Sequence, residues 1–322
     1  MTAVHLLNSI KPGGGENVAY NYARVLSKLN IFSTIVGRSF SLEYENMLIK
    51  DGIKIEKKLN RSILSESEYI FIHSNINLIK LYMNILLIKK QKKKVFYIQH
   101  LKFSKKKFQL LSILVNIICT DFIQITPITS NLVNKYININ KHYIVNYYIN
   151  KYSAIEYESI KKQIRQELNI NNKIVFIFSG IFKHGKRVED FINLAEKFNN
   201  NKDYFFLLLG DGQESNIVKQ YNGSNLMWLG MVTDVEKYLI ASDVYVFPSL
   251  FENEMLQMAL VEAINTEKKI LAYNTAINNY LLNNETCLTF NDMIERIVDD
   301  RYPQQLKRYD ETYALTEIQK IL

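Results

Sequence analysis

The chain has 322 residues, of which 48% are hydrophobic and 22% are charged. This length suits two domains of ordinary size, and the hydrophobic content excludes a disordered protein. Cys119 and Cys287 are far apart and match no metal-ligand spacing, so we expect buried, reduced thiols of a cytosolic protein. The longest apolar stretch, Leu110–Cys119, is too short to span a bilayer.

The net charge of +8 is divided unevenly along the chain. Residues 1–150 hold 21 Lys and Arg against 8 Asp and Glu, whereas the remainder holds 19 against 24. No acidic residue lies between Glu68 and Asp121, a stretch that contains ten lysines with interleaved apolar residues. A basic, amphipathic half predicts an anionic partner surface. No nucleic-acid recognition module accompanies the lysines, so we expect no nucleic-acid partner.

In the first half, apolar runs typical of buried strands alternate with helical patterns. Residues 1–9 are expected to form a strand and the start of a loop rather than a signal peptide. Further strands are expected at 31–36, 69–72, 95–98, 122–125 and 143–145. Helices are expected at 16–29, 76–92, 104–118 and 129–138.

The alternation pauses over 147–172, where the charged segment 156–168 favours a helix, so we place a domain boundary near 150–170. Strands are then expected at 173–178, 204–209, 227–229, 244–247, 270–272 and 287–290. Helices are expected at 187–199, 213–221, 233–241, 256–266 and 291–300. The pattern predicts an α/β fold of two Rossmann-like domains with parallel sheets, 1–155 and 156–302. A C-terminal helix within 303–322 is expected to pack back on the first domain.

Two loops between a strand and a helix have the composition of anion-binding sites. The first contains Gly13, Gly14 and Gly15, which let the backbone approach a ligand at a helix N-terminus. The second, 178–187, adds fixed cations to the same arrangement. Its basic residues are Lys183, Lys186 and Arg187.

An acidic motif follows the apolar run 244–247. Glu254 and Glu262 are separated by seven residues, and the second lies inside a helical pattern. A carboxylate at the carboxyl end of a strand lies where open α/β sheets bind ligands. Glu252 is a competing candidate for the first position, and the spacing to Glu262 selects Glu254.

The E-x7-E spacing and the two loops resemble those of retaining GT-B glycosyltransferases of family 4, the glycosyl transferases group 1. The resemblance implies the GT-B fold, in which two Rossmann-like domains face a central cleft. It also implies that Lys186 binds the donor diphosphate and that Glu262 accepts hydrogen bonds from the ribose. Glu254 would face the donor sugar, with His100 near its anomeric carbon. Further donor-binding positions are Gly14, Gly15, Gly180, Gly212, Met231, Met255 and Leu256.

Two positions leave alternatives open. Ile181 stands where the family has an arginine, and either Lys183 or Arg187 could supply that charge. His73 ends a predicted strand just as His100 does, so it is a rival for the histidine role.

The resemblance predicts a retaining hexosyltransferase that moves a sugar from a nucleotide sugar, a UDP-sugar, and needs no cofactor. No D-x-D motif is present in the sequence, which favours metal-independent chemistry. We expect a glycan or lipid-linked acceptor in bacterial lipopolysaccharide, O-antigen or capsule synthesis. The protein would be cytoplasmic and peripheral on the inner face of the cell membrane, bound through its Lys80–Lys107 region. The alternatives are a non-catalytic GT-B partner subunit and a nucleotide-sugar epimerase.

Overall fold

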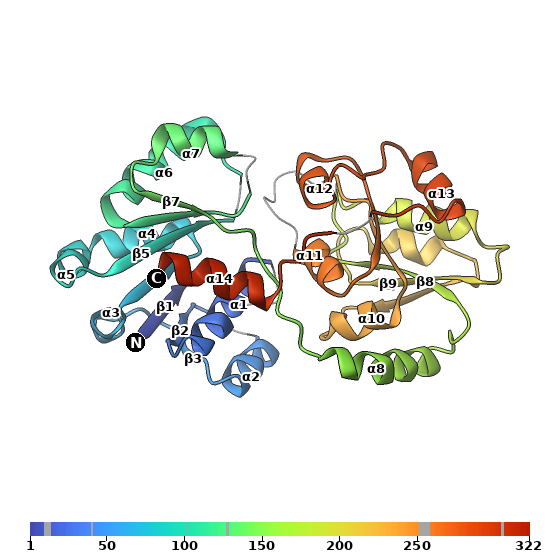
Figure 1. The fold of residues 1–322 in the computed structure, drawn as a ribbon, viewed down its shortest axis with the longest axis horizontal. Coiled ribbons are helices and arrows are strands. Elements are labelled where there is room, and N and C mark those ends of the chain that lie inside the picture. The colour runs from blue at the N-terminus through green and yellow to red at the C-terminus, as the bar shows by residue number, and fades with distance from the viewer. Residues whose placement is uncertain (10–13, 40, 101, 127–128, 251–257, 304–305) are drawn as a thin grey trace. The chain divides into compact units, whose positions relative to one another are not determined.

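The chain folds into two compact units, each built around one parallel sheet (Figure 1). The computed structural model describes residues 1–322 except 10–13, 40, 101, 127–128, 251–257 and 304–305. Unit 1 comprises Met1–Tyr147 together with Glu311–Leu322, and unit 2 comprises Tyr148–Glu252 and Ala259–Asp310. The predicted C-terminal helix therefore lies in unit 1.

The sheet of unit 1 has seven parallel strands in the order β3-β2-β1-β4-β5-β6-β7. The central strands are continuous apolar runs, as expected for a sheet covered on both faces. The strands are β1 Thr2–Leu6, β2 Phe32–Val36, β3 Lys54–Glu56, β4 Tyr69–Ile72, β5 Lys94–Gln99, β6 Asp121–Gln124 and β7 Asn140–Tyr143.

Helices cover both faces of this sheet. One face packs on α3, α4, α5, α6 and α7, whose apolar side chains share a buried cluster with β1, β4 and β5. The other face packs on α1 and α2, with α14 in contact with α1. The helices are α1 Gly14–Lys28, α2 Leu42–Lys50, α3 Arg61–Glu66, α4 Asn75–Tyr82, α5 Ile85–Lys90, α6 Lys105–Ile118, α7 Ser130–Tyr136 and α14 Glu311–Ile321.

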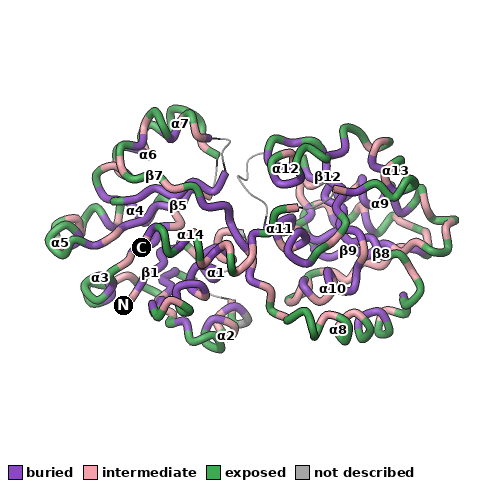
Figure 2. Tube along the Cα trace, viewed as in Figure 1, coloured by how far each residue is buried: buried purple, intermediate pink, exposed green. Residues whose placement is uncertain are grey.

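The sheet of unit 2 has five parallel strands in the order β10-β9-β8-β11-β12. Strands β8, β9 and β11 are mostly buried and β10 is only partly buried, whereas the outer faces of the surrounding helices are exposed (Figure 2). The strands are β8 Ile174–Ser179, β9 Tyr204–Leu209, β10 Leu226–Gly230, β11 Val244–Phe247 and β12 Lys269–Ala272.

One face of this second sheet packs on α9, the 3-10 helix η2 and α13 in an aromatic-rich core. On the other face, α8 packs along α10. The helices are α8 Ala154–Glu167, α9 Val188–Lys197, η2 Ser215–Gln220, α10 Val235–Ala241, α11 Met258–Asn265, α12 Ala276–Leu281 and α13 Phe290–Val298.

Several details of the sequence prediction are wrong. The segment 287–290 is not a strand: Cys287 makes only an isolated bridge with Tyr273, and α13 begins at Phe290 with Thr289 as its N-cap. Residues 213–221 form a 3-10 helix, because Ser215 and Asp211 bond back to the Gly212 turn and tighten it. The predicted helix 76–92 is two helices, since α4 ends at Tyr82 and α5 begins at Ile85.

Glycines allow two loops of unit 2 to touch. A Cβ on Gly210 (φ +122°) would lie 1.8 Å from the carbonyl oxygen of Gly180. The same segments are joined by hydrogen bonds from the amide of Gly180 to the carbonyl of Leu209 (3.1 Å) and from the amide of Phe182 to the carbonyl of Asp211 (2.9 Å). No larger residue fits at Gly210 without separating these backbones.

We predict that Gly210→Ala lowers the free energy of unfolding by about 2–5 kcal/mol, because it combines a left-handed backbone with an overlap on backbone atoms. Gly230→Ala is the matched control: its φ is +68° but its Cβ would meet nothing within 4 Å, so about 1–2 kcal/mol is expected. Urea denaturation followed by the fluorescence of Trp228, the single tryptophan, measures both. Equal losses in the two variants would contradict the steric argument.

Candidate functional site at the carboxyl edge of unit 2

The loops that follow β8, β9, β10 and β11 gather at one edge of the unit 2 sheet, because all of these strands are parallel. Hydrogen bonds join the loops to one another. The amide of Leu250 donates to the carbonyl of Gly185 (2.8 Å), which ties the loop after β11 to the loop after β8. The Trp228 indole donates to the carbonyl of Gly210 (2.8 Å). The described parts of these loops are therefore connected to one another at the edge of the sheet.

Two lysines of the β8–α9 loop lie at this edge. Lys183 and Lys186 are both partly exposed, and Nζ of Lys186 lies 5.8 Å from the centre of the Phe247 ring. The amide of Lys186 donates to the carbonyl of Lys183 (3.0 Å), so the two residues form one tight turn. Ile181, at the expected arginine position, is 52% exposed and supplies no charge.

Arg187 is held by an acid of its own helix. Its guanidinium donates two hydrogen bonds to the Asp190 carboxylate (2.7 and 2.9 Å), and the Tyr273 hydroxyl donates to that carboxylate as well (2.7 Å). Hydrogen bonding to Asp190 raises the pKa of Arg187. This pairing weakens the case for Arg187 as a diphosphate contact.

Glu262 lies in the second turn of α11 and is partly buried. Burial raises the pKa of Glu262 to about 7, while Lys151 lowers it and the neighbouring Glu236 raises it. Glu236 is 1% exposed and accepts hydrogen bonds from the Tyr148 hydroxyl (2.9 Å) and the amide of Lys151 (2.8 Å). The pair Glu236 and Glu262 concentrates negative charge beside the first residues of unit 2.

Three other predicted donor-binding positions lie at this edge. Gly180 and Gly212 belong to the touching loops, and a Cβ on Gly212 would lie 2.2 Å from the Phe182 carbonyl oxygen. Met231, directly after β10, is 63% exposed. The predicted residues Glu254, Met255 and Leu256 lie outside the described residues, as does the rival Glu252.

The remaining predicted residues belong to unit 1. Gly14 and Gly15 open α1, and a Cβ on Gly15 would meet nothing within 4 Å; Gly13 lies outside the described residues. His100 follows β5, and its Nε2 lies 3.0 Å from Nδ1 of His73. His73 in turn places Nε2 3.2 Å from Nδ1 of His5. The two rivals for the histidine role are therefore bonded to each other.

Buried polar atoms without partners lie beside these histidines. The hydroxyls of Tyr22 and Tyr147 and Oδ1 of Asn146 make no hydrogen bond among the described residues. The Tyr22 ring contacts both His73 (6.2 Å between ring centres) and Tyr147 (5.3 Å). Each unpaired buried group costs about 1–3 kcal/mol, and such groups are retained where another polar group is bound.

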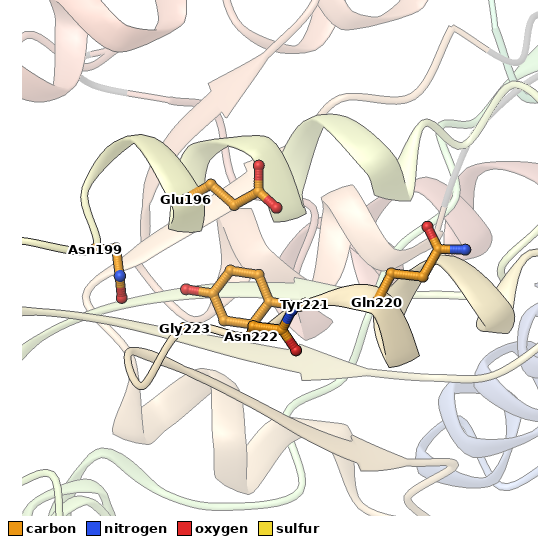
Figure 3. A pocket seen from close by; sticks show the side chains of 6 residues that line it. All are labelled: Glu196, Asn199, Gln220, Tyr221, Asn222 and Gly223. Carbon is orange, nitrogen blue, oxygen red and sulfur yellow. The ribbon is translucent and has the colours of Figure 1, made fainter.

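A hollow of about 280 Å³ in unit 2 lies away from this edge (Figure 3). Its lining residues lie between the ends of α9 and η2 and the starts of β9 and β10, at the opposite, amino edge of the sheet. They are Glu196, Asn199, Gln220, Tyr221, Asn222 and Gly223. It therefore forms no part of the candidate site.

Metal-binding groups and membrane-spanning helices are both absent from the described part of the chain. No group of three or more His, Cys, Asp or Glu side chains there is arranged to hold a metal ion. Within the same residues, none of the helices combines the length and the apolar character that crossing a bilayer requires.

Comparison with known proteins identifies the segment that contains this edge. Residues 173–300 match the family described as Glycosyl transferases group 1. An Escherichia coli UDP-Gal:alpha-D-GlcNAc-diphosphoundecaprenol alpha-1,3-galactosyltransferase is 31% identical over 149 residues, which span 40% of this chain and 38% of that relative.

Solved structures show that the chain has the GT-B fold. HepE of Anabaena in complex with UDP and glucose matches with a TM-score of 0.76 and 16% identity, over 99% of this chain and 98% of that one. WaaG, a glycosyltransferase involved in lipopolysaccharide biosynthesis, matches with a TM-score of 0.64 and 11% identity, over 99% of this chain and 94% of that one.

Sequence reasoning missed three residues that contact the predicted site residues of the two units. Asp190 binds Arg187, and the three-residue spacing of an acid and a base on one helix could have indicated it. Glu236 and His5 left no such signal. They come close to Glu262 and His73 only through the folding of distant segments.

We predict that one glutamate carboxyl titrates near pH 7, because the folded protein holds the Glu262 proton well above its ordinary pKa of 4.5. The free energy of unfolding should fall as the pH rises from 4.5 to about 7, because over this range the folded state keeps the Glu262 proton and the unfolded state loses it. Carbon-13 NMR of glutamate carboxyls measures the titration, and Glu262→Gln should remove that signal.

Lys151→Met is a control for which the direction of the pKa shift is predicted. Lys151 lowers the pKa of Glu262, so its removal should raise the titration midpoint further. If every glutamate carboxyl of the wild type titrates below about pH 5, the described environment of Glu262 is wrong.

Proposed function

We propose that the protein is a retaining glycosyltransferase that needs no metal and moves a hexose from a UDP-sugar to a lipid-linked glycan. One observation supports this most strongly. Lys186 follows β8 and Glu262 follows β11, and these are neighbouring strands of one parallel sheet within the segment that matches the family. A cation and an acid thus share the edge at which such sheets bind nucleotides.

The two side chains suit different parts of a nucleotide sugar. Lys186, beside the N-terminus of α9, would neutralise charge that develops on the departing diphosphate, with Lys183 in the place of the absent arginine. Ionised Glu262 would accept hydrogen bonds from both ribose hydroxyls, and such bonds favour the charged carboxylate. The acceptor hydroxyl would attack from the face that the diphosphate leaves, with Glu254 and His100 beside the sugar.

The relatives support the choice of donor and acceptor classes. The name of the Escherichia coli relative includes UDP-Gal and a diphosphoundecaprenol acceptor, and HepE was solved with UDP and glucose. WaaG takes part in lipopolysaccharide biosynthesis. We infer a UDP-hexose donor and an acceptor on a lipid carrier, in the assembly of bacterial surface polysaccharides such as O-antigen or capsule.

A surface of unit 1 fits a lipid-linked acceptor. α4 exposes Ile76, Ile79 and Met83, and α6 exposes Leu110, Ile113 and Ile117, each at helical spacing. The two helices contact each other, so the stripes belong to neighbouring elements. Exposed lysines accompany them, namely Lys89, Lys90, Lys92, Lys102, Lys105, Lys106 and Lys107.

Two lysines of the same stretch make hydrogen bonds to backbone carbonyls that stabilise the fold. Nζ of Lys93 donates to the carbonyls of Ser65 and Ser67, and Nζ of Lys94 donates to that of Ile321. The remaining exposed cations and apolar stripes have the composition of a surface that binds an anionic membrane. We propose that this surface holds the protein on the cytoplasmic face of the cell membrane.

We predict that Lys186→Ala lowers transfer from UDP-hexoses by about 10²–10³-fold, because it removes one fixed donor from the leaving diphosphate. Transfer assays over a panel of nucleotide sugars, with and without EDTA, measure this effect. Lys197→Ala, an exposed lysine at the other end of α9, should leave transfer unchanged.

The same panel separates the alternatives. A wild type that turns over no nucleotide sugar would favour a non-catalytic partner subunit, and one that only interconverts the sugars would favour an epimerase. If Glu254→Ala keeps full transfer activity, as its neighbour Glu252→Ala does, the assignment of the acidic motif is contradicted.

We predict that Lys89→Ala/Lys90→Ala weakens binding to anionic vesicles by roughly 30-fold at low salt, since each lysine near such a surface contributes about 1 kcal/mol. Lys57→Ala/Lys58→Ala is the matched control, because it removes an adjacent exposed pair elsewhere on unit 1. Vesicle flotation measures both. Equal flotation of the two variants, or no flotation of the wild type, would remove the membrane proposal.

A further inference from the structure

Three histidines of unit 1 form a continuous row across three neighbouring strands. His5 lies on β1, His73 follows β4 and His100 follows β5. Their rings are 5.4 Å and 5.2 Å apart, and successive nitrogens are 3.2 Å and 3.0 Å apart. At the inner end, Oγ of Ser33 on β2 lies 3.4 Å from Nε2 of His5.

All three imidazoles are neutral near pH 7. Burial lowers the pKa of His5 to about 3 and that of His100 to about 4. Burial, with the neighbouring histidines, also lowers the pKa of His73. A neutral imidazole has one N–H donor and one acceptor nitrogen, so each ring donates in one direction and accepts from the other. All hydrogen bonds in the row therefore point in the same direction, and the groups at its two ends determine that direction.

Ser33 decides the inner end. Its side chain is 7% exposed, and among the described residues its Oγ bonds only with His5. If His5 donated to Ser33, the serine hydrogen would need another acceptor in a buried place. If Ser33 donates to Nε2 of His5, every donor inside the row has a partner, and only Nδ1–H of the half-buried His100 remains for a ligand. We favour this direction because an unpaired donor costs more at the buried inner end than at the outer end.

We propose that Ser33, His5 and His73 form a polarised hydrogen-bond chain that fixes the His100 proton on Nδ1. Nδ1 of His5 then donates to Nε2 of His73, and Nδ1 of His73 donates to Nε2 of His100. His100 offers its own Nδ1–H as a donor to an oxygen atom of a ligand. Ser33, His5 and His73 are positioning residues in this arrangement. The identity of the ligand rests on the proposed function, in which the oxygen belongs to the donor sugar.

The surroundings hold the row in place. The His5 ring stacks on Phe71 (4.9 Å between centres, 10° between planes), and Phe71 stacks on Phe96 (4.7 Å, 8°). Tyr22 of α1 meets the His73 ring edge to face (84°). Such packing fixes the ring planes, so a change of proton position requires no movement of the rings.

Nitrogen-15 NMR of histidine side chains tests the chain directly, because the sequence holds five histidines and His100→Gln assigns one of them. In the wild type we expect His5, His73 and His100 each to be protonated on Nδ1. Ser33→Ala should remove the polarity and move the His100 signals toward the form protonated on Nε2. Ser33→Thr should restore the wild-type spectrum, and Ser112→Ala, a buried serine of α6, should not alter it.

A wild-type spectrum with the His100 proton on Nε2 overturns the proposal, as does a Ser33→Ala spectrum identical to that of the wild type. The wild-type spectrum alone tests the direction, whatever the stability of the variants. In transfer assays, Ser33→Ala should lower kcat/KM for the UDP-sugar by about 3- to 10-fold while the affinity for UDP alone stays constant. If the spectra are as predicted but neither the wild type nor any variant transfers sugar, the result supports the hydrogen-bond chain and counts against the proposed function.

Discussion

Parallel pairing brings the carboxyl ends of neighbouring strands to one edge of each sheet, and the proposed chemistry depends on this geometry. In unit 2 it brings four loops into contact and places Lys186 near the strand that leads to Glu262. In unit 1 it aligns His5, His73 and His100 across adjacent strands. Within each unit, groups far apart in sequence become neighbours because their strands are neighbours.

The strands most readily predicted are those buried on both faces. Tyr69–Ile72, Tyr204–Leu209 and Val244–Phe247 have the bounds that their apolar runs predict, because burial on both sides requires an uninterrupted run. The edge strands Lys54–Glu56 and Asn140–Tyr143 are short and polar, since one side of an edge strand faces solvent. The first was not predicted and the second was placed a few residues too late.

Local spacing indicates which residue types can form a site, whereas their partners depend on the fold. The sequence made Lys183 and Arg187 equal candidates for a missing charge, and it gave no sign of the contact between Arg187 and Asp190. It made His73 a rival of His100, and the fold joins the two by a hydrogen bond. Neither pairing follows from spacing, because strand register and loop closure decide which side chains meet.

The place of α14 has a consequence for synthesis on the ribosome. Its Glu311 pairs with Lys28 of α1, and its Tyr313 accepts a hydrogen bond from the amide of Val145 (2.9 Å). Ala314, Ile318 and Ile321 are buried. Unit 1 therefore cannot complete its core until residues 311–321 have left the exit tunnel, after all of unit 2 has been translated. Until then, the part of unit 1 that Ala314, Ile318 and Ile321 cover in the folded protein is exposed to solvent.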